Sequence, residues 1–204
     1  MKKTGRVVLV AAIVLITAGI SKANMVYQLE IFTENGLYAH SSSIDLYFEV
    51  VSNGLGMDFT FHNNSTVDSS IARIYFDDIG LLAYSGISNG TGTEFHTDSS
   101  PGNMPAGKAL TQSYEADISF GALMPPPHNG INPGEWVTIS FNLTGNNTST
   151  DVINALDNNN LRVGVHLIAL PDGSSESAVH VPEPATIALL GFGSLVLARR
   201  KRAK

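Results

Sequence analysis

The chain has 204 residues, no cysteine and a formal net charge of −6. Its length is that of one domain, and the lack of cysteine excludes disulfides, thiol catalysis and cysteine-ligated zinc. Residues 24–181 hold only three of the twelve basic residues but seventeen of the eighteen acidic ones, a net charge of −14. So acidic a body argues against nucleic acid and anionic lipid as partners, because both are bound through clustered lysine and arginine.

The first 23 residues predict a signal peptide. Basic residues at positions 2–6 precede an apolar run over residues 7–20 and a small-x-small site, Ser21-Lys22-Ala23. A helix of the apolar run would be about 21 Å long, which is short of the roughly 30 Å hydrocarbon core of a bilayer. We therefore expect export, with signal peptidase cutting between Ala23 and Asn24.

Residues 24–180 predict an all-β body. Apolar and polar residues alternate over segments such as 44–50 and 137–143, which is typical of strands with one buried face. Turn-forming pairs such as Asn53-Gly54 and Pro133-Gly134 separate these segments. The pattern favours an antiparallel β-sandwich or jelly roll. The expected strands are 26–32, 44–50, 57–62, 72–76, 81–85, 92–97, 113–120, 137–143, 163–169 and 175–181.

Two stretches of the body depart from the strand pattern. Thr150-Asp151 can cap a short helix over residues 152–156. Residues 99–127 are rich in Gly, Pro and Ser and predict a long surface loop interrupted by one strand. The loop ends in three consecutive prolines, residues 125–127, which favour an extended polyproline II conformation.

No catalytic motif is recognisable in the body. Gly-x-Ser-x-Gly is absent, and the six histidines do not stand at metal-ligand spacings. Asp77 and Asp78 are adjacent, so on a strand they would point to opposite faces and could not act as a general acid–base pair. We therefore expect a non-catalytic protein.

Calcium is the metal that the sequence would favour, because it prefers carboxylate and amide oxygens. Asp77, Asp78 and Asp157 are the candidate ligands, the last of them beginning an Asp-Asn-Asn-Asn run. No Asp-x-Asp-x-Asp-Gly loop accompanies them, and asparagine runs commonly form simple turns. No other cofactor is expected.

Two aromatic residues suggest an alternative role in binding carbohydrate. Trp136 and Tyr47 fall on the outward faces of their expected strands. Exposed aromatics on a β-sandwich can stack on sugar rings, with or without calcium. Trp136 could instead cover an edge of the core.

The C-terminal residues 181–204 predict a second targeting segment. Pro182-Glu183-Pro184 precede an apolar run over residues 185–198, which is expected to be helical and to cross a membrane. The basic cluster Arg199-Arg200-Lys201-Arg202 follows and would stay on the cytoplasmic side. Both ends of the chain would then point inward while the body is translocated.

This ordered set resembles the PEP-CTERM sorting domain, also known as the ice-binding protein C-terminal domain. The resemblance covers about 24 residues and implies an exosortase-type enzyme that recognises Pro182, Glu183 and Pro184 and removes the tail. Such proteins are associated with exopolysaccharide and biofilm production. The resemblance thus implies an exported protein, anchored transiently in the inner membrane and then placed at the cell surface or in the extracellular matrix.

The expected organisation is a signal peptide (1–23), a β-sandwich body (24–180) and a sorting signal (181–204). The leading hypothesis is a structural or interaction protein of the extracellular matrix. The alternatives are a carbohydrate-binding module, with extracellular polysaccharide as its partner, and a secreted hydrolase whose site residues are far apart in sequence.

Overall fold

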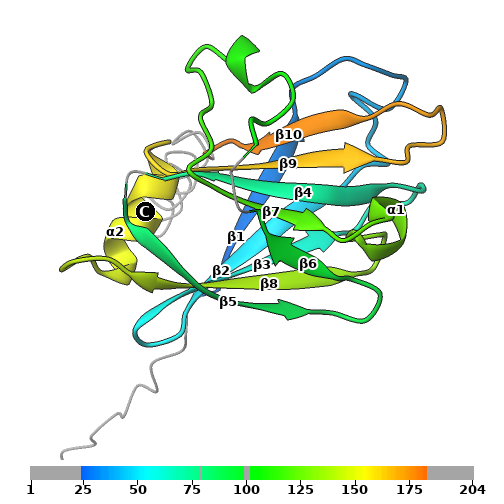
Figure 1. Ribbon diagram of the computed structural model, residues 1–204. Helices are drawn as coiled ribbons and strands as arrows, with labels where there is room; N and C mark the ends of the chain where they lie inside the picture. The colour runs from blue at the N-terminus through cyan, green and yellow to red at the C-terminus, as the bar shows by residue number, and fades with distance from the viewer. Residues whose placement is uncertain (1–23, 79, 99–101, 183–204) are drawn as a thin grey trace, which may run out of the picture.

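The computed structural model describes residues 24–78, 80–98 and 102–182, which form ten strands and three short helical segments (Figure 1). The strands are β1 (Met25–Ile31), β2 (Leu46–Ser52), β3 (Gly56–Asn63), β4 (Ser70–Asp77), β5 (Leu82–Asn89), β6 (Phe95–Thr97), β7 (Ile118–Ala122), β8 (Trp136–Leu143), β9 (Arg162–Ile168) and β10 (Glu176–His180). The helical segments are η1 (Gly107–Ala109), α1 (Pro126–Asn129) and α2 (Ser149–Asp157). The all-β prediction is confirmed, and every expected strand has a counterpart. The predicted signal helix and C-terminal apolar helix lie outside the described residues.

The ten strands form one antiparallel sheet that folds over on itself. The strand order is β5-β8-β3-β2-β1-β10-β9-β4-β7-β6. We call β5-β8-β3-β2-β1 half A and β10-β9-β4-β7-β6 half B. The two halves face each other across the core and are joined by the pairing of β1 with β10. The edge strands β5 and β6 are consecutive in the chain, and Phe95 N donates to Asn89 Oδ1 at 2.9 Å between them.

Aromatic side chains fill the space between the halves. Phe76 of half B meets Phe59 and Phe141 of half A, with ring centroids 5.3 and 4.9 Å apart and steeply inclined rings. Phe120 of β7 packs against Phe141 at 6.0 Å. All four are fully buried. Edge-to-face packing of this kind adds about 1 kcal/mol per pair to the hydrophobic stabilisation of the core.

Helix α2 crosses from β8 in half A to β9 in half B and covers one end of the sandwich (Figure 1). The predicted cap at Thr150 is wrong by two residues. The N-cap is Thr148, whose hydroxyl accepts from Asp151 N while the Asp151 carboxylate accepts from Thr148 N, a capping box. Val152 and Leu156 lie on the inner face of the helix and are fully buried in the core.

The segment between β6 and β7 differs from the predicted surface loop. Residues 102–117, which we call the covering segment, fold over the outer face of half B, where Met104 and Tyr114 are buried against Tyr75 and Val179. Strand β7 consequently begins at Ile118, five residues later than predicted. The polyproline II prediction is also wrong, because Pro126 begins α1, where its missing N–H costs no hydrogen bond.

The prediction of one buried face fits half A better than half B. Strand β2 alternates between buried and partly exposed residues, whereas all five residues of β10 and the first four of β9 are buried. The covering segment removes the outer face of these strands from solvent. No helix within the described ranges is long and apolar enough to cross a membrane.

Candidate functional site

The C-terminal sorting segment begins directly at the folded body. Strand β10 ends at His180, and Val181 and Pro182 are the last described residues. Strand β10 lies between β1 and β9, so it is an internal strand with a hydrogen-bonded neighbour on each side. Loss of the residues that follow Pro182 would therefore leave every strand intact. Glu183, Pro184 and the basic cluster 199–202 lie outside the described residues.

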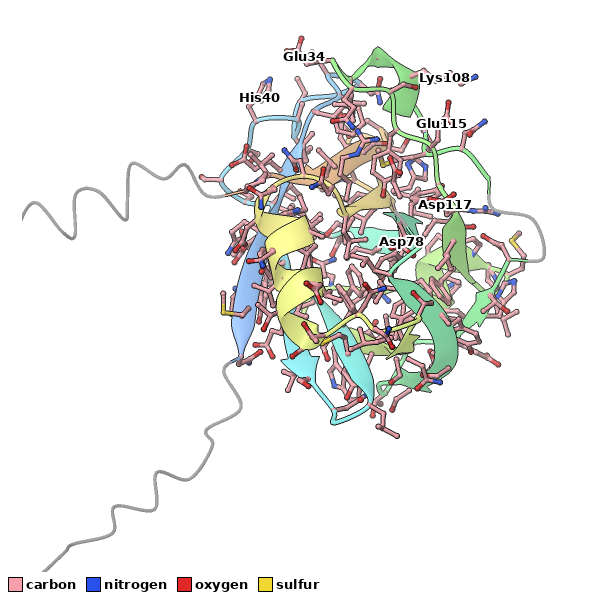
Figure 2. All side chains as sticks on the ribbon, turned by 90° about the vertical axis from the view of Figure 1, so that its left-hand side faces the viewer. Glu34, His40, Asp78, Lys108, Glu115 and Asp117 are labelled. Atoms are coloured by element: carbon pink, nitrogen blue, oxygen red, sulfur yellow. The ribbon has the colours of Figure 1, made fainter. Side chains whose placement is uncertain are left out.

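The chain enters and leaves the body at the same end. Strands β1 and β10 are antiparallel with Leu29 opposite His180, so the start of β1 and the end of β10 point the same way. Helix α2 lies at this end, where Tyr27 Oη donates to Asp157 Oδ1 at 3.3 Å. Figure 2 faces this end, with α2 in front. The predicted cleavage residue Ala23 is outside the described residues, and Asn24 is the first residue within them.

The comparisons with known proteins address this end of the chain. The family described as PEP-CTERM protein-sorting motif matches residues 180–202, starting at the last residue of β10. The chain carries a PEP-CTERM sorting motif. No curated protein and no solved structure matches the chain. The motif supports an exported protein that is processed by an exosortase-type enzyme and sorted to the cell surface.

The three calcium candidates each have a different structural partner. Asp77 forms an ion pair with the buried Arg162. Asp78 accepts from Leu81 N and Leu82 N at 3.0 and 3.1 Å and so shapes the turn before β5. Burial raises the pKa of Asp78.

Asp157, the third candidate, lies at the end of α2 beside Tyr27. The described part of the chain contains no group of three or more His, Cys, Asp or Glu side chains able to hold a metal ion. The structure therefore does not bring the predicted ligands together.

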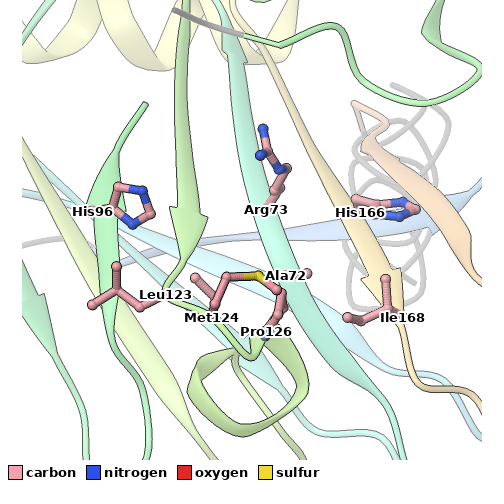
Figure 3. A pocket seen from close by; sticks show the side chains of 9 residues that line it. Ala72, Arg73, His96, Leu123, Met124, Pro126, His166 and Ile168 are labelled. Carbon is pink, nitrogen blue, oxygen red and sulfur yellow. The ribbon is translucent and has the colours of Figure 1, made fainter. Parts of the chain in front are cut away.

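A shallow groove of about 640 Å³ lies on the outer face of half B, beside the covering segment (Figure 3). His96, Gly121, Arg73 and His166 are aligned across β6, β7, β4 and β9. Gly121 has no side chain, and the Asp98 carboxylate lies over it, where a Cβ atom would be 3.3 Å from Asp98 Oδ1. The rest of the lining is largely apolar and comprises Ala72, Ala122, Leu123, Met124, Pro126 and Ile168.

Three polar side chains in and beside this groove, those of Arg73, Asp98 and Ser119, are hydrogen-bonded together. Asp98 accepts from Arg73 Nη1 at 3.2 Å and from Ser119 Oγ at 2.8 Å, so it offsets the arginine charge. The Ser119 hydroxyl therefore donates to a carboxylate and not to a histidine base, as nucleophilic catalysis would require. Burial lowers the pKa of His166, which makes it neutral at neutral pH. This arrangement gives no support to a hydrolytic mechanism.

The outer face of half A carries a row of aromatic side chains, which we call the aromatic row: Tyr47, His62 and Trp136. The residues are direct cross-strand neighbours on β2, β3 and β8. The Tyr47 and His62 rings are stacked with centroids 4.7 Å apart and planes inclined by 14°. Neither Tyr47 nor Trp136 belongs to a hydrophobic cluster of the described residues. The structure thus places Trp136 on the outward face, as predicted, and not over an edge of the core.

Gly90 positions the indole of Trp136. A Cβ atom at Gly90 would lie 2.6 Å from the Trp136 carbonyl oxygen and 3.0 Å from Cε2 of the ring, so the indole rests against the Gly90 backbone. Trp136 as a whole residue is still 38% exposed. One side of the indole is therefore supported by the protein while part of the residue stays open to solvent.

A second row runs beside the aromatic row, one pleat further along the strands. It contains Glu49, Thr60, Thr138 and Ser88, which are cross-strand neighbours from β2 to β5. The Thr60 and Thr138 hydroxyls are hydrogen-bonded to each other at 2.8 Å. We call this the hydroxyl row. Sequence patterns indicated Trp136 and Tyr47 separately, but His62 and the hydroxyl row became recognisable only through the strand register.

Proposed function

We propose that this protein is a non-catalytic component of the extracellular matrix, delivered to the cell surface through its PEP-CTERM motif to take a structural or interaction role among exopolysaccharides. The observation that carries the proposal is the position of the motif. It begins at the last residue of an internal strand. Processing after that residue would release a body whose strands and core are complete.

The shared exit end supports a transient membrane anchor. With both ends of the chain leaving beside α2, the precursor would be held at the inner membrane by this one end. The described acidic residues there, including Asp78, Asp117 and Asp157, give anionic lipid no counter-charge. Attachment would therefore rest on the signal peptide and the sorting tail until signal peptidase and the exosortase-type enzyme remove them.

Intact-mass analysis of the protein recovered from the native cell surface and medium tests the sorting step. A chain that starts at Asn24 and ends between Pro182 and Pro184 is the expected product. A Glu183→Ala variant should accumulate in the membrane fraction with its tail attached, whereas Glu115→Ala, an exposed acidic residue of the body, should be processed normally. Recovery of surface protein that retains residues 185–204 would contradict removal of the tail.

The matrix role needs a separate measurement. Deletion of the coding sequence should reduce the total amount of protein bound to the matrix polysaccharide and the mechanical stability of the biofilm. Expression of the unmodified chain should restore both. The Glu183→Ala chain should restore neither. Normal biofilm in the deletion strain would argue against the matrix role while leaving sorting intact.

A further inference from the structure

The outer face of half A combines two kinds of group that carbohydrate recognition uses. The aromatic row offers the ring edges of the stacked Tyr47 and His62 pair and the exposed part of the Trp136 indole, which can pack against the C–H groups of a sugar ring. The hydroxyl row lies alongside and supplies short donors and acceptors for sugar hydroxyls. Both rows lie on strands of a hydrogen-bonded sheet, so their positions are set before any ligand arrives.

The dimensions of the rows fit a chain molecule. Neighbouring strands are about 4.8 Å apart, so Tyr47 and Trp136, two strands apart, are separated by roughly 10 Å. This is the length of a disaccharide unit. The same register line continues to Gln28 on β1 and to Gly90 beyond β5, which extends it to roughly 20 Å. An extended polysaccharide lying across the strands could therefore contact the whole width of half A.

The charge of this face decides which polysaccharides fit. The three basic residues of the body are Arg73, Lys108 and Arg162, and all three belong to half B or to its covering segment. Half A instead presents carboxylates: Glu49 belongs to the hydroxyl row, and Asp58 lies on the same face, two residues before Thr60 on β3. Burial lowers the pKa of His62, so this ring is neutral at neutral pH. An anionic polymer would meet repulsion here with no compensating cation.

We propose that the outer face of half A, formed by Tyr47, His62, Trp136, Thr60 and Thr138, is a binding surface for an extended neutral polysaccharide. This inference rests on the proposed matrix function and names the ligand class of that function. Trp136, supported by Gly90, provides the main stacking surface. The Thr60 and Thr138 pair hydrogen-bonds the hydroxyls of the same sugar chain.

The chain offers a direct reporter for this surface. Trp136 is the only tryptophan of the 204 residues, so intrinsic tryptophan fluorescence reports on the aromatic row alone. Protein recovered from the cell surface would be titrated with neutral β-glucan, xyloglucan and galactomannan oligosaccharides, and with alginate as the anionic comparison. We expect a saturable emission change with at least one neutral glycan, stronger for a tetrasaccharide than for a disaccharide, and none with alginate.

Affinity electrophoresis in gels containing the same polysaccharides then tests the residues. Trp136→Ala should lower the affinity by roughly tenfold or more, as expected for a stacking aromatic at the centre of a binding surface. Tyr47→Ala should weaken binding less. Met124→Ala is the matched control, because Met124 is a large exposed apolar residue (81%) in the groove of half B and should not change retardation. The melting temperature of each variant identifies any loss of folding.

Three results would overturn the inference: no neutral glycan changes the fluorescence or mobility, alginate binds better than the neutral glycans, or folded Trp136→Ala and Tyr47→Ala bind as tightly as the unchanged protein. If the protein fails to bind glycans but still reaches the surface and supports the biofilm, only the ligand assignment is lost. If it never reaches the surface, the proposed function itself fails.

Discussion

The two outer faces of the sandwich belong to one continuous sheet, yet one is covered and the other is open. Over half B, Met104 and Tyr114 of the covering segment pack against Tyr75 and Val179. Over half A, the hydroxyl row and the aromatic row remain partly exposed, with no hydrophobic cluster of the described residues upon them. The difference shows that a strand's outer face cannot be assigned to solvent from its alternation alone.

The residues of half B explain why its outer face is covered. Gly164 on β9 leaves a hollow in the sheet, and Met104 fills it so closely that a Cβ atom at Gly164 would lie 2.5 Å from Met104 Sδ. Tyr114 Oη donates to the carbonyl oxygens of Tyr75 and Arg162 at 2.8 and 3.0 Å. The guanidinium of Arg162 lies 5.0 Å from the centre of the Tyr114 ring. The covering segment is thus held by packing and hydrogen bonds together.

The largest effect that this comparison predicts is at Tyr114. Tyr114→Ala removes a fully buried ring and both hydrogen bonds, so the free energy of unfolding should fall by about 3–5 kcal/mol. Urea unfolding followed by far-UV circular dichroism measures it. A loss below about 1 kcal/mol would mean that the covering segment contributes little to stability, and the distinction between the two faces would lose its energetic basis.

The interior between the faces should make stability depend on pH. His180 is buried against Tyr27 and Phe48, and neither ring nitrogen has a hydrogen-bond partner within the described residues. Burial lowers its pKa from 6.5 to about 4. Between these values the unfolded chain binds more protons at this residue than the folded one, so stability falls as the pH drops, and His180 contributes about 3 kcal/mol to that fall.

Unfolding midpoints measured from pH 7 to pH 4 test this dependence. His180→Phe keeps an aromatic ring and removes the titrating group, so its pH dependence over this window should be smaller by that amount. His40→Phe, at an exposed loop position, is the control for exchanging a histidine for phenylalanine. Equal slopes for all three proteins would contradict the assignment to His180.

Adding one methyl group to the outer face of each half should change stability by different, smaller amounts. Gly164→Ala must displace Met104 and should cost about 1–2 kcal/mol. Gly86→Ala on β5 meets no atom within 4 Å and should be neutral or slightly stabilising, since alanine loses less backbone entropy on folding. Thermal unfolding of both variants provides the measurement. Equal costs would show that the closer packing over half B has no consequence for stability.

A small effect on stability is also expected at Trp136. Because it lies on the open face and belongs to no hydrophobic cluster of the described residues, Trp136→Ala should change the free energy of unfolding by about 1 kcal/mol or less. The same substitution should abolish most of the neutral-glycan binding proposed above. A large loss of stability would instead indicate that the aromatic row is a structural element.

The strands could be predicted from the sequence wherever apolar–polar alternation is bounded by turn-forming residues. Gly54 and Gly134, from the two turn-forming pairs Asn53-Gly54 and Pro133-Gly134, both have positive φ values, which glycine adopts without strain. The helix was found as well, although its cap was misplaced because Asp151 serves as the third helical residue of a capping box that starts at Thr148. The pattern of residues 99–127 misled more seriously, since loop-like composition conceals a segment whose Tyr114 is fully buried.

The sequence by itself determined the sorting motif of this protein and its β-rich fold class. The motif at residues 180–202 is contiguous, and strand alternation depends only on residues that are neighbours along the chain. Both can therefore be recognised without the tertiary structure. Only the tertiary structure decided that the chain enters and leaves the body at one end and that His62 stands between Tyr47 and Trp136. These arrangements depend on the register between strands far apart in sequence, which follows from packing of the whole core and from no local pattern.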